Sequence, residues 1–137
     1  MGNSQFNDIT GTRTETVAVN SIAADPTRSV LLLRAPDNIT IESVLMFTGV
    51  ALTGDNAHRK DFNVVTANPI GGALSEKAVK DYTAGVDTAD NGVETLWTPT
   101  GTDGDLAENN MLLIEMQKQG NGFEFCGSFV VKYRVQE

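Results

Sequence analysis

The sequence predicts an all-β protein: an antiparallel β-sandwich with jelly-roll-like winding, or alternatively an immunoglobulin-like one. Apolar residues recur with period two, as in the stretch FVVKYRV from Phe129 to Val135, where Lys132 and Arg134 point away from the apolar face. Turn-forming residues separate such stretches at intervals of about 8–15 residues. No segment shows a sustained helical period. Together these patterns indicate seven or eight strands.

Three strands are expected in the first half of the chain. TRTETVAVNSI places Val17 and Val19 on one face, and RSVLLLR comes after the Asp25-Pro26 turn. The third strand is expected in NITIESVLMFTGVAL, after the break at Ala35-Pro36. Strict alternation would put one set of its side chains on a single face and the intervening set on the other. The first set is Ile39, Ile41, Leu45 and Phe47, and the second is Thr40, Glu42, Val44 and Met46.

Four further strands are expected after residue 60, in DFNVVTA, VETLW, NMLLIEMQK and FEFCGSFVVKYRV. Residues 73–89 leave two options open, a short helix with Ser75 as N-cap or an edge strand between loops. Gly120-Asn121-Gly122 joins the last two apolar stretches. Glycine and asparagine tolerate positive φ, so this tripeptide predicts a tight hairpin that pairs two central strands.

Residues 1–12 are predicted to form an extended arm, and residues 13–137 a single sandwich domain. The arm is polar apart from Phe6 and Ile9. Two apolar anchors on an extended segment suit docking onto a neighbouring chain, so Asn3, Phe6 and Ile9 are the candidate contact residues of the arm. A frayed terminus is the alternative.

Two stretches are apolar on both faces, Val30–Leu33 and Met111–Ile114. In a two-sheet sandwich only one face of each sheet meets the core, so the other face needs a cover. A long loop or a neighbouring subunit could provide this cover, and exposed apolar patches usually mark contact surfaces. Self-association is therefore expected, with Leu31, Leu33 and Leu113 as the candidate outer positions.

Composition excludes several classes of partner. Ten Lys and Arg against eighteen Asp and Glu give a formal net charge of −8, which repels phosphate backbones and argues against nucleic acid. No stretch approaches the roughly 18 apolar residues of a membrane span. No apolar run near Met1 indicates a signal peptide, and the single Cys126 excludes an intramolecular disulfide.

No catalytic, cofactor or metal site is expected. His58 lies in the polar stretch DNAHRKD without a nearby nucleophile, and Cys126 lies in a strand pattern typical of a buried thiol. The carboxylates of the polar loops lack the twelve-residue spacing of a calcium loop, and solvated turns account for them. These residues are Asp55, Asp87, Asp90, Asp103, Asp105 and Glu108.

The segment LLLRAPDNITIESVLMFTGVALTGDNAHRKDFNVV resembles small β-sandwich proteins encoded among tailed-bacteriophage head genes. The shared pattern is a strand ending in Ala-Pro, an Ile-Thr-Ile strand, a Thr-Gly-Asp loop and another strand. LAENNMLLIEMQKQGNGFEFCGSFVVKYRV is similar to the ending of the same group, although Asn109-Asn110 stands where members often have Gly-Asp. The resemblance covers roughly residues 30–135.

The resemblance implies a capsid decoration (cement) protein, a virion structural protein without enzymatic activity. Its partners would be the major capsid protein and itself, commonly as a homotrimer, with Asn3, Phe6 and Ile9 of the arm as the capsid-binding residues. It would be made in the bacterial host cytoplasm and reside on the capsid exterior. The alternative hypothesis is a carbohydrate- or receptor-binding β-domain of a phage fibre or tail, in which Trp97, Tyr82 and loop acids form the site.

Overall fold

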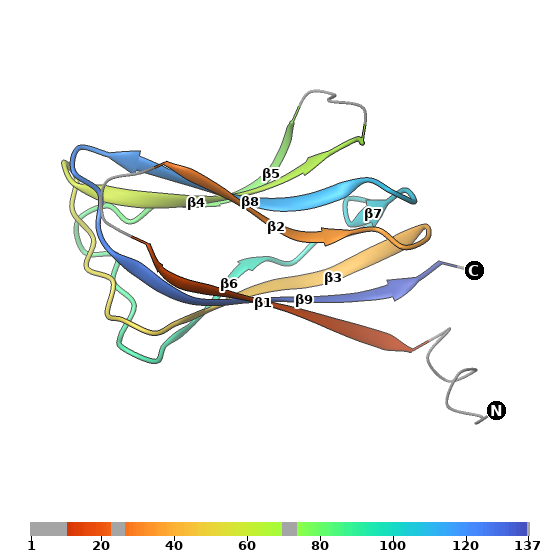
Figure 1. Ribbon diagram of the computed structural model, residues 1–137, viewed down its shortest axis with the longest axis horizontal. Helices are drawn as coiled ribbons and strands as arrows, with labels where there is room; N and C mark the ends of the chain where they lie inside the picture. Colours follow the sequence, from red (N-terminus) through yellow and green to blue (C-terminus); the bar gives the residue numbers. More distant parts are fainter. Residues whose placement is uncertain (1–10, 23–26, 70–73, 137) are drawn as a thin grey trace.

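The computed structural model describes residues 11–22, 27–69 and 74–136, and these residues form a β-sandwich (Figure 1). The strands are β1 (Thr12–Ile22), β2 (Arg28–Arg34), β3 (Ile39–Thr48), β4 (Arg59–Ala67), β5 (Ser75–Lys80), β6 (Val93–Trp97), β7 (Asp105–Leu106), β8 (Met111–Gln119) and β9 (Phe125–Val135). No helix in the described part of the chain is long and apolar enough to cross a membrane.

The strands form two antiparallel sheets whose order defines a jelly roll. One sheet has the order β1-β9-β3-β6, with the short β7 paired to β3, and the other has the order β2-β8-β4-β5. β1 pairs with β9, β2 with β8, β3 with β6 and β4 with β5. The pairs show a long antiparallel hairpin that is rolled up into two layers. Over the first four strands the chain alternates between the sheets, with β1 and β3 in one and β2 and β4 in the other. The sandwich prediction is confirmed, and its winding is of the jelly-roll type.

The Gly120-Asn121-Gly122 turn does not pair two neighbouring strands, so the hairpin prediction is wrong. β8 lies between β2 and β4, whereas β9 lies between β1 and β3 in the other sheet. The turn therefore carries the chain from one layer to the other. Gly120 and Gly122 do adopt positive φ, 58° and 64°, and a Cβ at Gly120 would meet the Ala57 carbonyl oxygen.

The core between the sheets is centred on a cluster of aromatic side chains. The Phe62 ring lies 5.1 Å from that of Phe125 and 5.7 Å from that of Tyr82, in edge-on contact. Phe123 and Phe129 complete the cluster at 6.4 and 6.3 Å from Phe62. Offset and edge-to-face pairs of this kind add to the stabilisation from burial alone. The aromatic cluster joins β4 of one sheet to β9 of the other.

The strict alternation predicted for β3 fails at Glu42. The register against β9 shifts between Ile41 and Ser43, which marks a β-bulge. The bulge reverses the parity of the residues after it. Ile39, Ile41, Val44 and Met46 are consequently the buried set, while Leu45 is half-buried and Phe47 exposed. The pattern of β9 holds as expected, with Phe129, Val131 and Tyr133 buried and Lys132 and Arg134 exposed.

The open choice for residues 73–89 resolves to an edge strand. β5 pairs with β4 over Ser75 to Lys80, with one register shift. At the other end of the chain, β1 begins at Thr12, one residue before the predicted domain start. Residues 1–10, which include Asn3, Phe6 and Ile9, lie outside the described residues.

The aromatic cluster yields a stability prediction. Phe62→Ala removes a fully buried ring that contacts four others, so the free energy of unfolding is expected to fall by about 3–5 kcal/mol. Leu74→Ala is the control, since that side chain is 52% exposed and its loss is expected to cost less than about 0.5 kcal/mol. Urea denaturation measures both values. Equal effects of the two substitutions would show that Phe62 is not central to the core.

Candidate functional site

The outer face of the four-stranded sheet carries an apolar row across three strands. Leu31 of β2 pairs with Leu113 of β8, and Leu113 pairs in turn with Val65 of β4. Leu31 is 49% exposed, Leu113 is half-buried, and Val65 is buried among its neighbours. Val79 of β5, 46% exposed, lies one row away opposite Asn63. We call these four apolar residues, Leu31, Val65, Val79 and Leu113, the outer patch.

Leu33 does not belong to the outer patch, contrary to the prediction from alternation. The register of β2 against β8 shifts between Leu31 and Leu33, so Leu31 faces Leu113 whereas Leu33 faces Leu112. This bulge turns both Leu32 and Leu33 toward the core, where Leu33 is only 8% exposed. The expected outer position of Leu33 is therefore wrong. Leu31 and Leu113 do share the outer face, and self-association through them stays a prediction.

Val65 and Val79 were missed by sequence reasoning, although a signal for Val65 existed. In DFNVVTA, Val65 has the parity opposite to that of Phe62 and Val64, so strict period two places it on the face away from the core. Val79 lies in residues 73–89, for which the sequence predicts either a short helix or an edge strand. The pairing of β5 with β4 places Val79 on the outer face, opposite Asn63.

The row that contains Val79 is otherwise polar, because Asn63 of β4 lies between Val79 of β5 and Glu115 of β8. Asn63 is 5% exposed, and its Oδ1 is buried with no hydrogen-bond partner among the described residues. Asp61, next on this face, accepts a hydrogen bond from Arg59 Nε at 2.9 Å and from the Tyr82 backbone N–H at 3.1 Å. A buried acceptor without a donor costs roughly 1–3 kcal/mol. The outer patch thus adjoins a position whose polar group is unsatisfied within the described part of this chain.

A second apolar surface lies on the outer face of the five-stranded sheet. Phe47 of β3 pairs with Val93 of β6 and with Ser128 of β9, and both apolar side chains are exposed, at 37% and 54%. In the next row Leu45 and Val130 pair with each other and are half-buried. The two rows across β1, β9, β3 and β6 contain no charged residue: Ala18, Ser128, Phe47 and Val93, then Thr16, Val130, Leu45 and Thr95.

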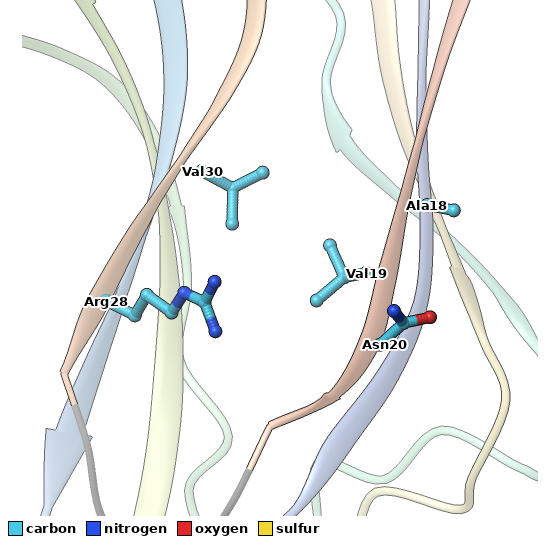
Figure 2. A pocket seen from close by; sticks show the side chains of 5 residues that line it. All are labelled: Ala18, Val19, Asn20, Arg28 and Val30. Atoms are coloured by element: carbon cyan, nitrogen blue, oxygen red, sulfur yellow. The ribbon is translucent and has the colours of Figure 1, made fainter.

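An open groove lies between the two sheets, along the edge where β1 is the last strand of one sheet and β2 is the last strand of the other. Figure 2 shows Val19 of β1 and Val30 of β2 pointing toward one another, with Arg28 and Asn20 nearer the end where the strands are connected. The groove has a volume of about 220 Å³ and is completed by Ala18. Val19 and Val30 also pack against the core from their partly buried positions. This groove combines an apolar floor with polar groups at one end.

Tyr82 and Trp97 are both core residues, which removes them from the predicted sugar site. Tyr82 is fully buried, and its hydroxyl lies 2.8 Å from Thr88 Oγ1. Trp97 is 9% exposed and packs in the same core. Neither ring is available to stack on a carbohydrate, so the fibre or tail alternative loses the residues proposed for its site.

The single histidine has a structural role in the loop before β4. His58 is exposed, and its Nδ1 accepts a hydrogen bond from the Asn121 backbone N–H at 2.9 Å, which ties this loop to the turn between β8 and β9. Asp55 Oδ1 accepts the backbone N–H groups of Ala57 and His58 at 2.7 and 3.1 Å. These backbone donors hold the pKa of Asp55 below its usual value.

Two of the other loop acids, Asp87 and Asp105, accept hydrogen bonds from residues that are distant in the sequence. Asp87 accepts the Gly54 backbone N–H at 2.8 Å, and Asp105 accepts the Thr40 hydroxyl at 2.9 Å. Among the described residues, no group of three or more His, Cys, Asp or Glu side chains is arranged to hold a metal ion. Cys126 is a free, half-buried thiol in β9, and a Cβ at Gly49 would lie 2.9 Å from its Sγ.

Comparisons with known proteins give a distant structural likeness. No protein-family model matches the chain, and no curated protein matches it. The chain is similar to a chain in the structure of infectious bursal disease virus Gx strain, with a TM-score of 0.47 and 12% sequence identity. The match covers 90% of this chain and 32% of that one, so this chain spans about a third of its length. No residue role is transferred from this match.

Burial of Tyr82 predicts a loss of stability at high pH. Desolvation is the main cause that raises the pKa of Tyr82 from 10.0 to about 12. In the unfolded chain the phenol ionises near its ordinary pKa, whereas the folded chain keeps it neutral. The resulting stabilisation is present below pH 10 and is lost as the pH rises from 10 to about 12.

Urea unfolding at pH 9 to 12 tests this contribution. The free energy of unfolding is expected to fall by up to roughly 1.4 kcal/mol per pH unit because of Tyr82 alone. Tyr82→Phe is the matched control, because it keeps the ring and removes the titrating group. The fall between pH 10 and 12 should be shallower in the variant. Identical slopes for the two proteins would contradict the assignment.

Proposed function

We propose that this protein is a non-enzymatic structural component of a virus particle. It binds the outside of a tailed-phage capsid and stabilises the capsid by bridging its subunits, as the sequence resemblance implies. Its partners are the major capsid protein and further copies of itself, three being the number that the resemblance favours. It is made in the host cytoplasm and then added to the capsid exterior.

The observation that carries this proposal is the outer patch. A sheet face that meets water normally presents polar residues in alternation with the buried ones. Here Leu31 and Val79 are about half exposed on the outer face. Covering the exposed part of Leu31 would contribute about 2 kcal/mol. The patch therefore favours contact with another protein chain.

Two outer faces with exposed apolar residues suit a bridging role. The outer patch lies on one sheet, and the uncharged rows with Phe47 and Val93 lie on the other, so the two surfaces face away from one another (Figure 1). A protein that links capsid subunits needs at least two separate contact surfaces. We assign the outer patch to self-association.

Co-sedimentation with capsids tests the proposed function. Purified protein is mixed at micromolar concentration with tailed-phage capsids that lack decoration, and the capsids are pelleted. The protein is expected in the pellet at a fixed ratio to the major capsid protein. Its absence from the pellet with capsids of the phage that encodes it would contradict capsid binding.

A separate measurement tests the role of the outer patch in self-association. Leu31→Ser is expected to weaken self-association about tenfold or more, as followed by light scattering over a range of concentrations. Val93→Ser is the matched control, because it removes an equally exposed apolar side chain from the other sheet. A strictly monomeric wild-type protein, or equal effects of the two substitutions, would overturn this assignment.

A further inference from the structure

The groove between β1 and β2 is bordered by two free sheet edges. Among the described residues, β1 pairs only with β9 and β2 only with β8, so each strand ends its sheet there. An edge strand presents unpaired backbone N–H and C=O groups that can accept another strand. The register of β2 is regular from Arg28 to Leu31, before the bulge. A short extended segment therefore has a suitable edge to join there.

The side chains at the groove specify what such a segment would carry. Val30 and Val19 provide an apolar floor that suits one apolar side chain (Figure 2). Arg28, two residues before Val30 on the same face of β2, is exposed, and no ion pair joins it to a carboxylate among the described residues. An added strand would thus match the groove if it carried an apolar residue and an acidic residue two positions apart.

The chain itself contains this pattern in its N-terminal segment, where Phe6 and Asp8 are separated by Asn7. We propose that residues 4–8 of a second copy of this chain add to the edge of β2 as an antiparallel strand. In this register Phe6 lies opposite Val30, and Asp8 lies opposite Arg28. Directly opposed residues on neighbouring strands are the pairs that stabilise a sheet.

The segment of the same copy cannot take this position. β1 begins at Thr12 and reaches Val19 at the groove seven residues later, a distance of about 24 Å along an extended strand. Arg28 lies beyond Val30 toward the C-terminal end of β1, so it is farther from Thr12 than the groove residues Val19 and Val30 are (Figure 2). The four residues from Asp8 to Thr12 span at most about 14 Å. Asp8 can therefore reach Arg28 only on a neighbouring copy.

The opposite face of the added strand remains available for other contacts. Gln5, Asn7 and Ile9 alternate with Phe6 and Asp8, so they would lie on the outer side of the four-stranded sheet. Ile9 thus stays free for the capsid contact predicted for the arm. The exchange of segments concerns the isolated protein in solution and does not depend on capsid binding.

A charge exchange tests the Asp8–Arg28 pair. Asp8→Arg and Arg28→Asp are each expected to weaken self-association about fivefold in sedimentation velocity, and the double variant is expected to restore it. Arg34→Asp at the other end of β2 is the control for net charge and is expected to follow neither pattern. If the double variant is weaker than both single variants, the pair does not form.

Disulfide trapping separates exchange between copies from contacts within one copy. In a Cys126→Ser background, Asp8→Cys is introduced into one tagged preparation and Arg28→Cys into another, and the two are mixed and oxidised. A disulfide between the two tagged chains is expected. The same mixture with Ile9→Cys in place of Asp8→Cys should give far less, since Ile9 would lie on the other face.

Absence of the mixed disulfide would overturn the proposal. A disulfide formed only inside the chain carrying both Asp8→Cys and Arg28→Cys would also overturn it and would show that a copy binds its own segment. Neither result bears on co-sedimentation with capsids, which is measured separately. Failure of the strand exchange and failure of capsid binding are therefore distinguishable.

Discussion

Each sheet of the sandwich has two faces, and only one of them can be buried against the other sheet. This constraint organises the whole molecule. The inner faces are filled by the aromatic cluster around Phe62 and by the aliphatic side chains that flank it. The outer faces have no such cover in the described chain, yet each carries exposed apolar residues. Burial of apolar area is the main favourable term in protein association, so these faces are where other chains would gain most by binding.

The pattern of the fold was readable from the sequence because period two is a strong signal over long strands. The stretch from Phe129 to Tyr133 shows the alternation without interruption, and all its expected buried residues are buried. The turn chemistry of Asp25-Pro26 and Ala35-Pro36 separated β1, β2 and β3 correctly. The strand in residues 75–80 was not decided, because its sequence SEKAVK has too few apolar residues to show a period.

Bulges and layer changes could not be read from the sequence. One extra residue at Glu42 and one at Leu32 each reverse the parity of the rest of the strand, and nothing in the local composition marks them. The bulge at Glu42 places Val44 in the core, and the bulge at Leu32 places Leu33 in the core. The turn at Gly120–Gly122 has the composition of a hairpin but joins two sheets. Which of these occurs depends on pairings with strands far away in the chain, such as β2 with β8.

The central claim is that the outer sheet faces meet other protein chains when the protein is in its working state. Hydroxyl-radical footprinting read by mass spectrometry measures it most directly, because it reports the solvent access of individual side chains. We predict that Leu31 and Val79 lose reactivity when the dilute monomer is compared with the self-associated protein, and that Phe47 and Val93 lose reactivity when the free protein is compared with the capsid-bound protein. Unchanged reactivity of all four side chains, on self-association and on the particle alike, would contradict the account.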